Sequence, residues 1–332
     1  MNALFFAEGG PAFGLGHLRR CAALADAMTA RGWECRFLAR DAAAGAWLAE
    51  RGRTLAPSQP PLSGRLPDAD YSCDAFVVDS YEATNEEIAS KAKGSSGIIL
   101  AFDDHMNRHP VADIVLNAGA LAPEQAWPGR IERLLGPAYH PLCAEYLPVS
   151  GPREIRARVT RVLVTLGGSG KAALFKRVVS TVRLALPDAA IDCVVGPFAE
   201  EPLGLASDAR VNLVHSPRSL KPLMLDCDLA VAASGQTLFE LAATGTPAVA
   251  ACLADNQDPN LRAMARKGAA LSAGAVADAG FERELAARLA QAADPDVRRG
   301  LSDAGRALID GRGGARVEAA LSSLLAKRRA AR

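Results

Sequence analysis

Short apolar segments alternate with helical segments through the first half of this 332-residue chain, and this alternation limits the possible fold most. Strands are predicted at 3–7, 35–39, 76–79, 98–102 and 114–117, and helices at 17–31, 42–51 and 84–93. Apolar strands that alternate with helices are typical of a parallel sheet with helices on both faces. Residues 57–67, rich in proline and serine, are expected to form a loop. The first half is therefore predicted to be a doubly wound α/β domain.

The pattern weakens over residues 141–152, which include three prolines, and then begins again. Further strands are expected at 162–166, 191–195, 211–214, 229–232 and 248–252, with helices at 171–186, 236–244 and 257–267 and a helical tail over 281–326. We therefore expect two Rossmann-like domains, at 1–145 and 155–332, with the tail in the second. Open α/β sheets bind ligands at the carboxyl ends of their strands, so an interdomain cleft is expected to hold the ligand.

The first predicted strand is followed by a glycine-containing loop and a helix start, Gly14-Leu15-Gly16-His17. Glycines let the backbone approach a ligand closely, and the N–H groups at a helix N-terminus favour a phosphate. The positive field of the helix start also opposes protonation of His17, which keeps its imidazole able to accept a proton. The segment predicts a base beside an anion site, although a histidine that only packs at the turn fits the same pattern. Asp79 and Asp103 both end strands, and either is placed to orient His17.

Two loops in the second half have the composition of phosphate-binding turns. Gly167-Gly168-Ser169-Gly170 follows one predicted strand, and Ser234-Gly235-Gln236-Thr237 follows another. Together their backbone N–H groups suit a diphosphate, although each alone is also an ordinary strand-to-helix turn. Thr237 and Glu240 have the spacing of a capping box. From the residues alone, this interpretation is preferred to one in which Glu240 binds ribose hydroxyls.

A polar segment follows the strand at 248–252, and its Asn256, Gln257 and Asn260 are candidates for hydrogen bonds to a sugar or phosphate. The start of a capped helix explains part of this composition as well. His105 and His109 have i,i+4 spacing, but the following proline and the loop composition argue against a helix that would bring them to a metal. No metal site is therefore predicted.

The charge and the cysteine content exclude several classes of protein. Lys and Arg number 38 and Asp and Glu 37, so a net charge of +1 gives no basic field for nucleic acid. No apolar run is long enough for a membrane span, and no signal peptide is expected. The seven cysteines are scattered without a C-x-x-C motif, which is typical of a cytoplasmic protein with reduced thiols. The expected assembly is a monomer or a weak homo-oligomer.

Several of these motifs occur together in an order and spacing that resemble one enzyme family. They are Gly14 to Cys21, Val78-Asp79-Ser80-Tyr81, Phe102-Asp103-Asp104, Val115-Leu116-Asn117, Leu135 to Tyr139, Leu166-Gly167-Gly168-Ser169 and Asp255-Asn256-Gln257-x-x-Asn260. Over about residues 3–275 the chain resembles the UDP-sugar hydrolases of pseudaminic acid biosynthesis. These enzymes hydrolyse UDP-2,4-diacetamido-2,4,6-trideoxy-β-L-altropyranose and are related in fold to MurG-type glycosyltransferases.

The resemblance implies a two-domain GT-B fold, UDP in the second domain and a role in flagellin glycosylation. It also implies that His17 is the general base for water, that no metal or other cofactor is needed, and that Glu240 binds ribose. The nucleotide-binding residues that it implies are Gly168, Ser169, Val214, His215, Ser234, Gly235, Gln236, Thr237 and Glu240. The substrate-binding residues are Gly14, Gly16, Arg20, Asp79, Tyr81, Asn117, Asn256, Gln257 and Asn260.

The chain departs from the family pattern at Ser80, where many members have histidine, at Gly170, where an acidic residue is frequent, and at Gly119, where an Asn-x-Asn pair would end. These differences concern the sugar more than the nucleotide. The leading prediction is an inverting UDP-sugar hydrolase. An inverting glycosyltransferase would instead use His17 to deprotonate an acceptor hydroxyl, and a non-catalytic nucleotide-sugar-binding protein would not need His17.

Overall fold

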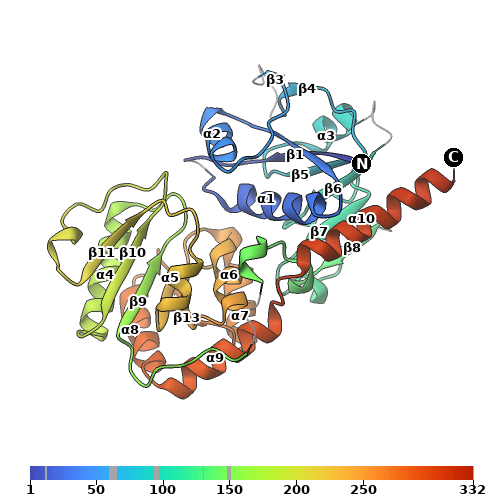
Figure 1. Cartoon of the computed structure of the whole chain (residues 1–332). Helices are drawn as coiled ribbons and strands as arrows, with labels where there is room; N and C mark the ends of the chain where they lie inside the picture. The colour runs from blue at the N-terminus through green and yellow to red at the C-terminus, as the bar shows by residue number, and fades with distance from the viewer. Residues whose placement is uncertain (12, 60–65, 93–96, 130, 148–150, 332) are drawn as a thin grey trace. The chain divides into compact units, whose positions relative to one another are not determined.

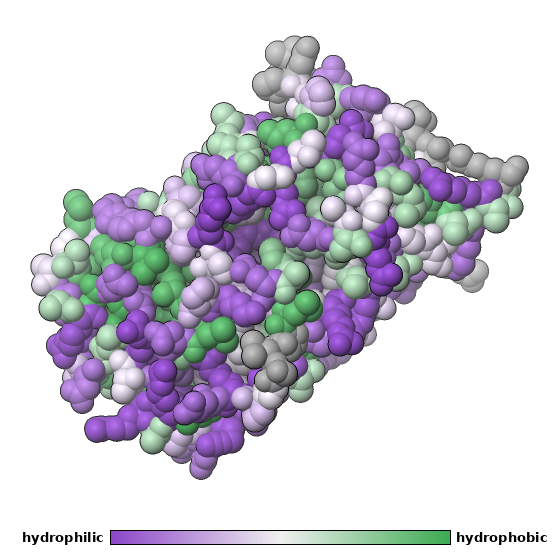
Figure 2. All heavy atoms as spheres, in the orientation of Figure 1, coloured by the Kyte–Doolittle hydropathy of each residue, from purple (hydrophilic) through white to green (hydrophobic). Residues whose placement is uncertain are grey.

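The computed structural model describes residues 1–11, 13–59, 66–92, 97–129, 131–147 and 151–331. The chain forms two compact units, of which the first comprises Met1–Ala144 and Gly311–Arg332 and the second Glu145–Asp310. Each unit contains a six-stranded sheet with helices packed on it (Figure 1). In the view of Figure 2, polar side chains are interspersed among the apolar ones over both units. No helix of the described residues is long and apolar enough to cross a membrane.

The first unit is built on a parallel sheet with the strand order β2-β1-β5-β6-β7-β8. Its strands are β1 (Asn2–Ala7), β2 (Glu34–Leu38), β5 (Ala75–Asp79), β6 (Ile98–Phe102), β7 (Ile114–Asn117) and β8 (Glu132–Leu135). The five predicted strands are present, whereas β8 was not predicted. Strands β3 (Ser58–Gln59) and β4 (Asp68–Ala69) form a separate antiparallel pair around the predicted loop, in which 60–65 lie outside the described residues.

Strand β1 is the switch point of this sheet, because it pairs with β2 on one side and with β5 on the other. The register aligns Ala7 with Asp79, so the chain leaves both strands at the same level of the carboxyl edge. Loops diverge at such a point and leave room for a ligand. The fold therefore brings together residues that follow β1 and β5, although about 70 residues separate them in the sequence.

The helices of the first unit are α1 (Gly16–Thr29), α2 (Ala42–Glu50), α3 (Asn85–Ala92) and α10 (Gly313–Ala330). Helix α1 buries Leu18, Cys21, Ala25 and Met28 in the core, as the helical spacing of its apolar residues predicts. Short 3-10 helices lie at η1 (Ala122–Glu124), η2 (Pro137–Tyr139) and η3 (Ala144–Tyr146).

The C-terminal helix α10 belongs to the first unit, which corrects the expected second domain of 155–332. The Trp33 indole donates a hydrogen bond to Glu318 Oε1 over 3.1 Å. Two glycines let the helix approach closely: a Cβ at Gly313 would lie 2.2 Å from the His140 carbonyl oxygen, and one at Gly314 would lie 2.9 Å from Ala27 Cβ. Apolar residues of α10 then complete the first core, namely Val317, Leu321 and Leu325. The helical period predicted this helix but not the sheet on which it packs.

The second unit has a parallel sheet with the order β11-β10-β9-β12-β13-β14. Its strands are β9 (Arg161–Thr165), β10 (Ala190–Val195), β11 (Val211–His215), β12 (Leu229–Ala233), β13 (Ala248–Cys252) and β14 (Leu271–Ala275). Its helices are α4 (Ala172–Ala185), α5 (Lys221–Asp226), α6 (Gln236–Thr244), α7 (Asp258–Arg266), α8 (Phe281–Ala292) and α9 (Pro295–Leu308), with 3-10 turns η4 (Leu205–Ser207) and η5 (Asp255–Gln257). Strand β14 and helix α5 were not predicted. The switch point lies at β9, which pairs with β10 and β12.

Candidate active site

His17 lies in the first turn of α1. Its side chain is largely buried, and its Nδ1 atom lies 3.9 Å from Glu8 Oε2 and 3.9 Å from Asp79 Oδ1. Tyr81 packs edge-on against the imidazole, with ring centroids 4.6 Å apart. Within the described part of the chain, Nδ1 has no hydrogen-bond partner. The two carboxylates therefore place negative charge beside this ring.

Glu8 was not selected by the sequence analysis, and its carboxylate is fully buried directly after β1. Oε2 accepts a hydrogen bond from the Tyr81 backbone N–H at 2.9 Å, and Oε1 accepts one from the Glu82 N–H at 3.0 Å. The Ser80 hydroxyl donates a further bond to Oε1. These donors come from the loop after β5 and fix the carboxylate against His17. The only signal in the sequence was an acidic residue at the end of an apolar strand.

Arg20 lies one helical turn after His17 and links two carboxylates. Its Nε and Nη2 donate to Asp79 over 2.5 and 2.7 Å, and Nη2 also donates to Asp104 Oδ2 over 2.8 Å. The Tyr81 hydroxyl donates to the same Asp104 oxygen over 2.8 Å. Burial lowers the pKa of Arg20, but Asp104 and Asp79 outweigh burial and raise that pKa above its usual value. Burial alone would raise the pKa of Asp104, whereas the charge of Arg20 and its hydrogen bond lower it to about 2.

The interaction between Asp104 and Arg20 should contribute to stability. We expect Asp104→Asn to lower the free energy of unfolding at pH 7 by about 2 kcal/mol, because the lowered pKa of Asp104 means that folding favours its charged form. The folded-state pKa is the lower one, so this contribution is present above the unfolded pKa near 4 and is lost as the pH falls toward 2. Urea unfolding of both proteins at several pH values measures the difference, which should shrink between pH 4 and 2.

The matched control for this prediction is Asp296→Asn, because that side chain is 89% exposed and should leave stability nearly unchanged. An Asp104→Asn difference of the same size at pH 7 and at pH 2 would contradict the assignment.

Of the two candidate aspartates, Asp79 lies beside His17, whereas Asp103 forms hydrogen bonds within its own loop. Its carboxylate oxygens accept hydrogen bonds from the backbone N–H groups of residues 107 and 108, at 2.8 and 2.9 Å. The Asn117 amide donates to the Asp103 carbonyl oxygen over 3.0 Å. Both side chains are buried and shape the loop after β6. For Asn117, contact with a sugar stays a prediction.

The two glycines expected at this site have different structural roles. Gly14 has a φ of +70°, and backbone hydrogen bonds of 2.8 and 3.0 Å join it to Gly10. Gly16 begins α1, which has no side-chain bond at its N-cap and no acidic residue in its first turn. The positive end of this helix is therefore not neutralised from within the helix.

His105 packs against the Tyr81 ring, and no three His, Cys, Asp or Glu side chains of the described residues gather as metal ligands.

In the second unit, Gly168 and Ser169 lie in the turn between β9 and α4. The turn begins at Gly167, with a φ of +89°. A Cβ at Gly196 would lie 2.6 Å from the Gly167 carbonyl oxygen, so the loops after β9 and β10 touch through their backbones. The Phe198 N–H donates to the Gly168 carbonyl oxygen over 2.9 Å. This turn is thus held against the loop after β10 at the carboxyl edge.

At the adjoining start of α4, a carboxylate already accepts a hydrogen bond from one backbone N–H group. Glu200 accepts a hydrogen bond from the N–H of Ala172, the first residue of α4, at 3.1 Å. The Glu200 residue is exposed. An anionic ligand at this helix start would have to compete with Glu200, which the sequence analysis did not anticipate.

The start of helix α6 differs from the capping box that was expected at Thr237 and Glu240. Its N-cap is Gly235, so Thr237 lies within the first turn and cannot serve as the cap that Glu240 would complete. The Glu240 side chain is buried, with 1% exposed. The Ser234 hydroxyl donates to the Ala251 carbonyl oxygen over 3.1 Å, which ties the loop after β12 to β13. The interpretation that the residues alone favoured for Glu240 was therefore wrong.

Gln257 meets the loop after β12 at the start of α6, whose first residue is Gln236. A Cβ at Gly235 would lie 3.7 Å from Gln257 Nε2. The other amide atom of this side chain, Oε1, accepts a hydrogen bond from the Leu253 N–H at 3.1 Å. The fold thus brings together the glycine loop that follows β12 and the polar segment that follows the adjacent strand β13. The two remaining polar candidates lie beside Gln257 in the sequence, in η5 and in the first turn of α7, namely Asn256 and Asn260.

Val214 and His215 end β11, the edge strand, which β10 separates from β9. His215 is exposed, and its Nε2 lies 3.0 Å from Glu201 Oε2. These residues share the carboxyl edge with the two glycine loops, but two strand positions separate them from the Gly168 turn. Binding of uracil at this position stays a prediction.

Comparison with solved structures identifies the class of fold. The chain is similar to MurG of Acinetobacter baumannii, with a TM-score of 0.66 and 16% identity, covering 97% of this chain and 99% of that chain. It is similar to the spinosyn forosaminyltransferase SpnP, with a TM-score of 0.69 and 15% identity, covering 98% and 99%. Arabidopsis thaliana UGT89C1 complexed with UDP gives a TM-score of 0.66 and 14% identity over 98% and 99%. The chain has the α/β GT-B fold of two Rossmann-like units, as predicted.

One curated protein relates the chain to a particular enzyme. It is the "pseudaminic acid cytidylyltransferase and UDP-2,4-diacetamido-2,4,6-trideoxy-beta-L-altropyranose hydrolase" of Helicobacter pylori, which is 27% identical over 188 residues. The match covers 55% of this chain and 35% of that protein, so the chain matches about a third of its relative's length. No family model matches the chain. The similarity confirms the resemblance that the motifs indicated.

Proposed function

We propose that this chain hydrolyses a UDP-sugar. His17 takes a proton from water while the water oxygen bonds to the anomeric carbon of the sugar. The bond from that carbon to the β-phosphate oxygen breaks with inversion, and UDP leaves with the electron pair. The observation that carries the proposal is the position of His17, whose Nδ1 lies 3.9 Å from each of two buried carboxylates. These charges stabilise the imidazolium that forms when the base is protonated.

The second unit supplies the groups proposed for UDP. The start of α6 has no side-chain cap and no acidic residue in its first turn, so its positive end suits the charge that develops on the leaving diphosphate. Gln257 lies beside this helix start. The Glu240 carboxylate is proposed to accept the ribose hydroxyls, which requires that binding uncovers a side chain that is 1% exposed.

The proposed substrate is UDP-2,4-diacetamido-2,4,6-trideoxy-β-L-altropyranose, in pseudaminic acid biosynthesis, because the Helicobacter pylori relative is named for hydrolysis of this compound. Turnover is proposed to need no metal, because helix N-termini supply positive charge for the diphosphate.

The test of this function is release of UDP from a panel of UDP-sugars with no acceptor present, in buffer with and without excess EDTA. We expect UDP to appear at the same rate in both buffers, with the altropyranose compound as the best substrate. Release only after addition of an acceptor would show a glycosyltransferase. Tight UDP-sugar binding without release would show a binding protein.

The role proposed for Glu240 predicts a selective loss of affinity. Glu240→Gln should weaken UDP binding about tenfold, because it replaces hydrogen bonds to a charged group, at about 1.5–3 kcal/mol, by neutral ones at about 0.5–1.5 kcal/mol. The affinity for 2′,3′-dideoxy-UDP should change little, because that ligand lacks both ribose hydroxyls. Calorimetric titration of the two ligands measures the difference. Glu284→Gln is the control, since Glu284 is an exposed partner of Arg288. An equal loss for both ligands would show that Glu240 acts on the structure of α6 rather than on ribose.

A further inference from the structure

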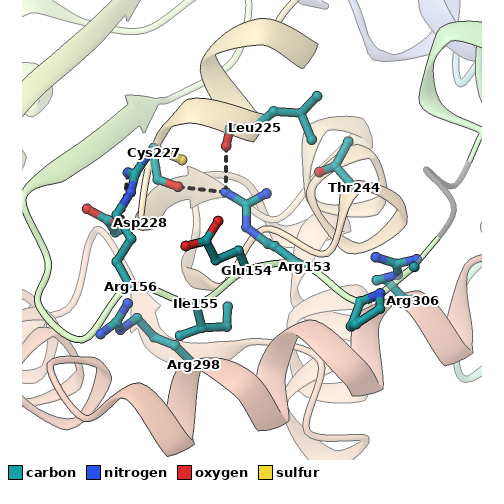
Figure 3. Close-up of a pocket in the computed structure, with 12 residues that line it drawn as sticks. Arg153, Glu154, Ile155, Arg156, Leu225, Cys227, Asp228, Thr244, Arg298 and Arg306 are labelled. Carbon is teal, nitrogen blue, oxygen red and sulfur yellow. Dashed lines mark hydrogen bonds and ion pairs between the residues drawn. The ribbon is translucent and has the colours of Figure 1, made fainter.

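Figure 3 shows a pocket of the second unit. Its lining residues lie at the opposite edge of the sheet from the glycine loops. It has a volume of about 230 Å³. The pocket is lined by residues 151–156, which precede β9, and by Asp228, which directly precedes β12. Leu225 near the end of α5 and Thr244 at the end of α6 also line it. These positions belong to the amino edge of a parallel sheet, so the pocket is separate from the proposed nucleotide site.

The lining of this pocket is rich in arginine. Four guanidinium groups and two carboxylates line it, which leaves an excess of two positive charges; they are Arg153, Arg156, Arg298 and Arg306, with Glu154 and Asp228. Asp228 already has partners within the protein, because it accepts hydrogen bonds from the Thr160 N–H and hydroxyl and from Arg156. Arg153 also has partners within the protein, and Figure 3 shows it donating hydrogen bonds to the carbonyl oxygens of Leu225 and Cys227.

Arg298 differs from its neighbours because its side chain is completely buried while much of its bonding capacity is unused. It comes from α9, and its Nη2 donates to the Ala157 carbonyl oxygen over 3.2 Å. Its Nε and Nη1 have no hydrogen-bond partner among the described residues. Burial lowers the pKa of Arg298, with Asp228 and Asp294 opposing this effect through space. A guanidinium nevertheless stays protonated in proteins, so an incompletely paired charge is buried beside the pocket.

We propose that this pocket binds a phosphate-type oxyanion, with Arg298 as its principal cation. Because the Arg298 side chain is completely buried, binding must uncover its guanidinium. Planar guanidinium groups match the oxygens of such an anion better than ammonium groups do, and this lining contains no lysine. An anion there supplies the charge that Arg298 lacks, whereas a cationic or apolar ligand would leave it unpaired. Arg156 and Glu154 are exposed, so the pocket has contact with solvent through which an ion can exchange. The ligand is either free phosphate or the phosphate group of a small metabolite.

The test compares thermal unfolding in chloride and in phosphate at constant ionic strength. Phosphate at about ten times its dissociation constant should raise the midpoint temperature of thermal unfolding of the wild-type protein by about 3 °C. Arg298→Met should abolish this rise. Arg299→Met is the matched control, since it removes the same charge from the next residue of α9, whose side chain is 52% exposed, and it should respond as the wild type does.

The same measurement with glucose 6-phosphate distinguishes the two sources of the phosphate group. A larger rise with glucose 6-phosphate indicates a metabolite, and an equal or larger rise with inorganic phosphate indicates the free ion. Stabilisation that survives in Arg298→Met places the anion elsewhere and overturns the proposal. Absence of any response to either compound in the wild type also overturns it. If Arg298→Met does not fold, Arg156→Gln serves as the second variant, because Arg156 is half-exposed; its response should be at least halved.

Discussion

His17→Ala is expected to lower kcat for UDP release by about 100-fold or more, which is the usual contribution of a positioned general base. The imidazole lies beside the carboxylates of Glu8 and Asp79, and alanine leaves water with no base in its place. Binding of UDP should be unchanged, because the groups proposed for it belong to the second unit. Stopped assays of UDP release and calorimetric titration of UDP measure the two quantities separately.

Two controls distinguish lost chemistry from lost structure. Added imidazole should restore part of the His17→Ala rate, because the vacated space adjoins the same carboxylates. His109→Ala should retain turnover, since His109 lies in the loop between β6 and β7 and not in the His17 cluster. A His17→Ala rate near that of the wild type would remove the assignment of the base.

The parallel strands were predictable because strands buried on both faces have nearly unbroken apolar sequences. β1 reads NALFFA and β9 reads RVLVT, and both are flanked by a strand on each side. The two strands of the six-stranded sheets that were not predicted are β8, with the sequence ERLL, and β14, with LSAGA. Both are edge strands and are only partly buried, so their sequences lack the apolar run on which the prediction depends.

The candidate site was predictable only in part, because a sequence pattern identifies a loop but not its neighbours. The position of His17 at a helix start followed from local sequence. Its proximity to Asp79 depends on β1 pairing with β5, and no local pattern encodes that pairing. The capping box at Thr237 was wrong for a related reason, since the helix begins at Gln236 after a glycine N-cap. Sequence spacing alone does not determine which residue becomes the cap.

Glu8→Gln is the second large effect that we expect, with kcat lowered roughly 10- to 100-fold, because a unit charge 3.9 Å from His17 Nδ1 is removed from a buried site. Glu8 should matter more than Asp79 as a source of negative charge. Both Asp79 oxygens are engaged by the Arg20 guanidinium, whereas the guanidinium near Glu8, that of Arg40, lies 3.7 Å away and pairs more closely with Glu82.

The variant Glu8→Asp distinguishes this electrostatic role from a structural one. Aspartate keeps the negative charge but is one methylene too short for the hydrogen bonds that Glu8 accepts from the loop after β5. The value of kcat should therefore be higher in Glu8→Asp than in Glu8→Gln. Glu82→Gln is the control, because Glu82 is paired with Arg40 at 2.5 Å and should leave kcat nearly unchanged. An equal loss of kcat in both Glu8 variants would show that Glu8 only holds the loop at Ser80 and Tyr81 through its hydrogen bonds.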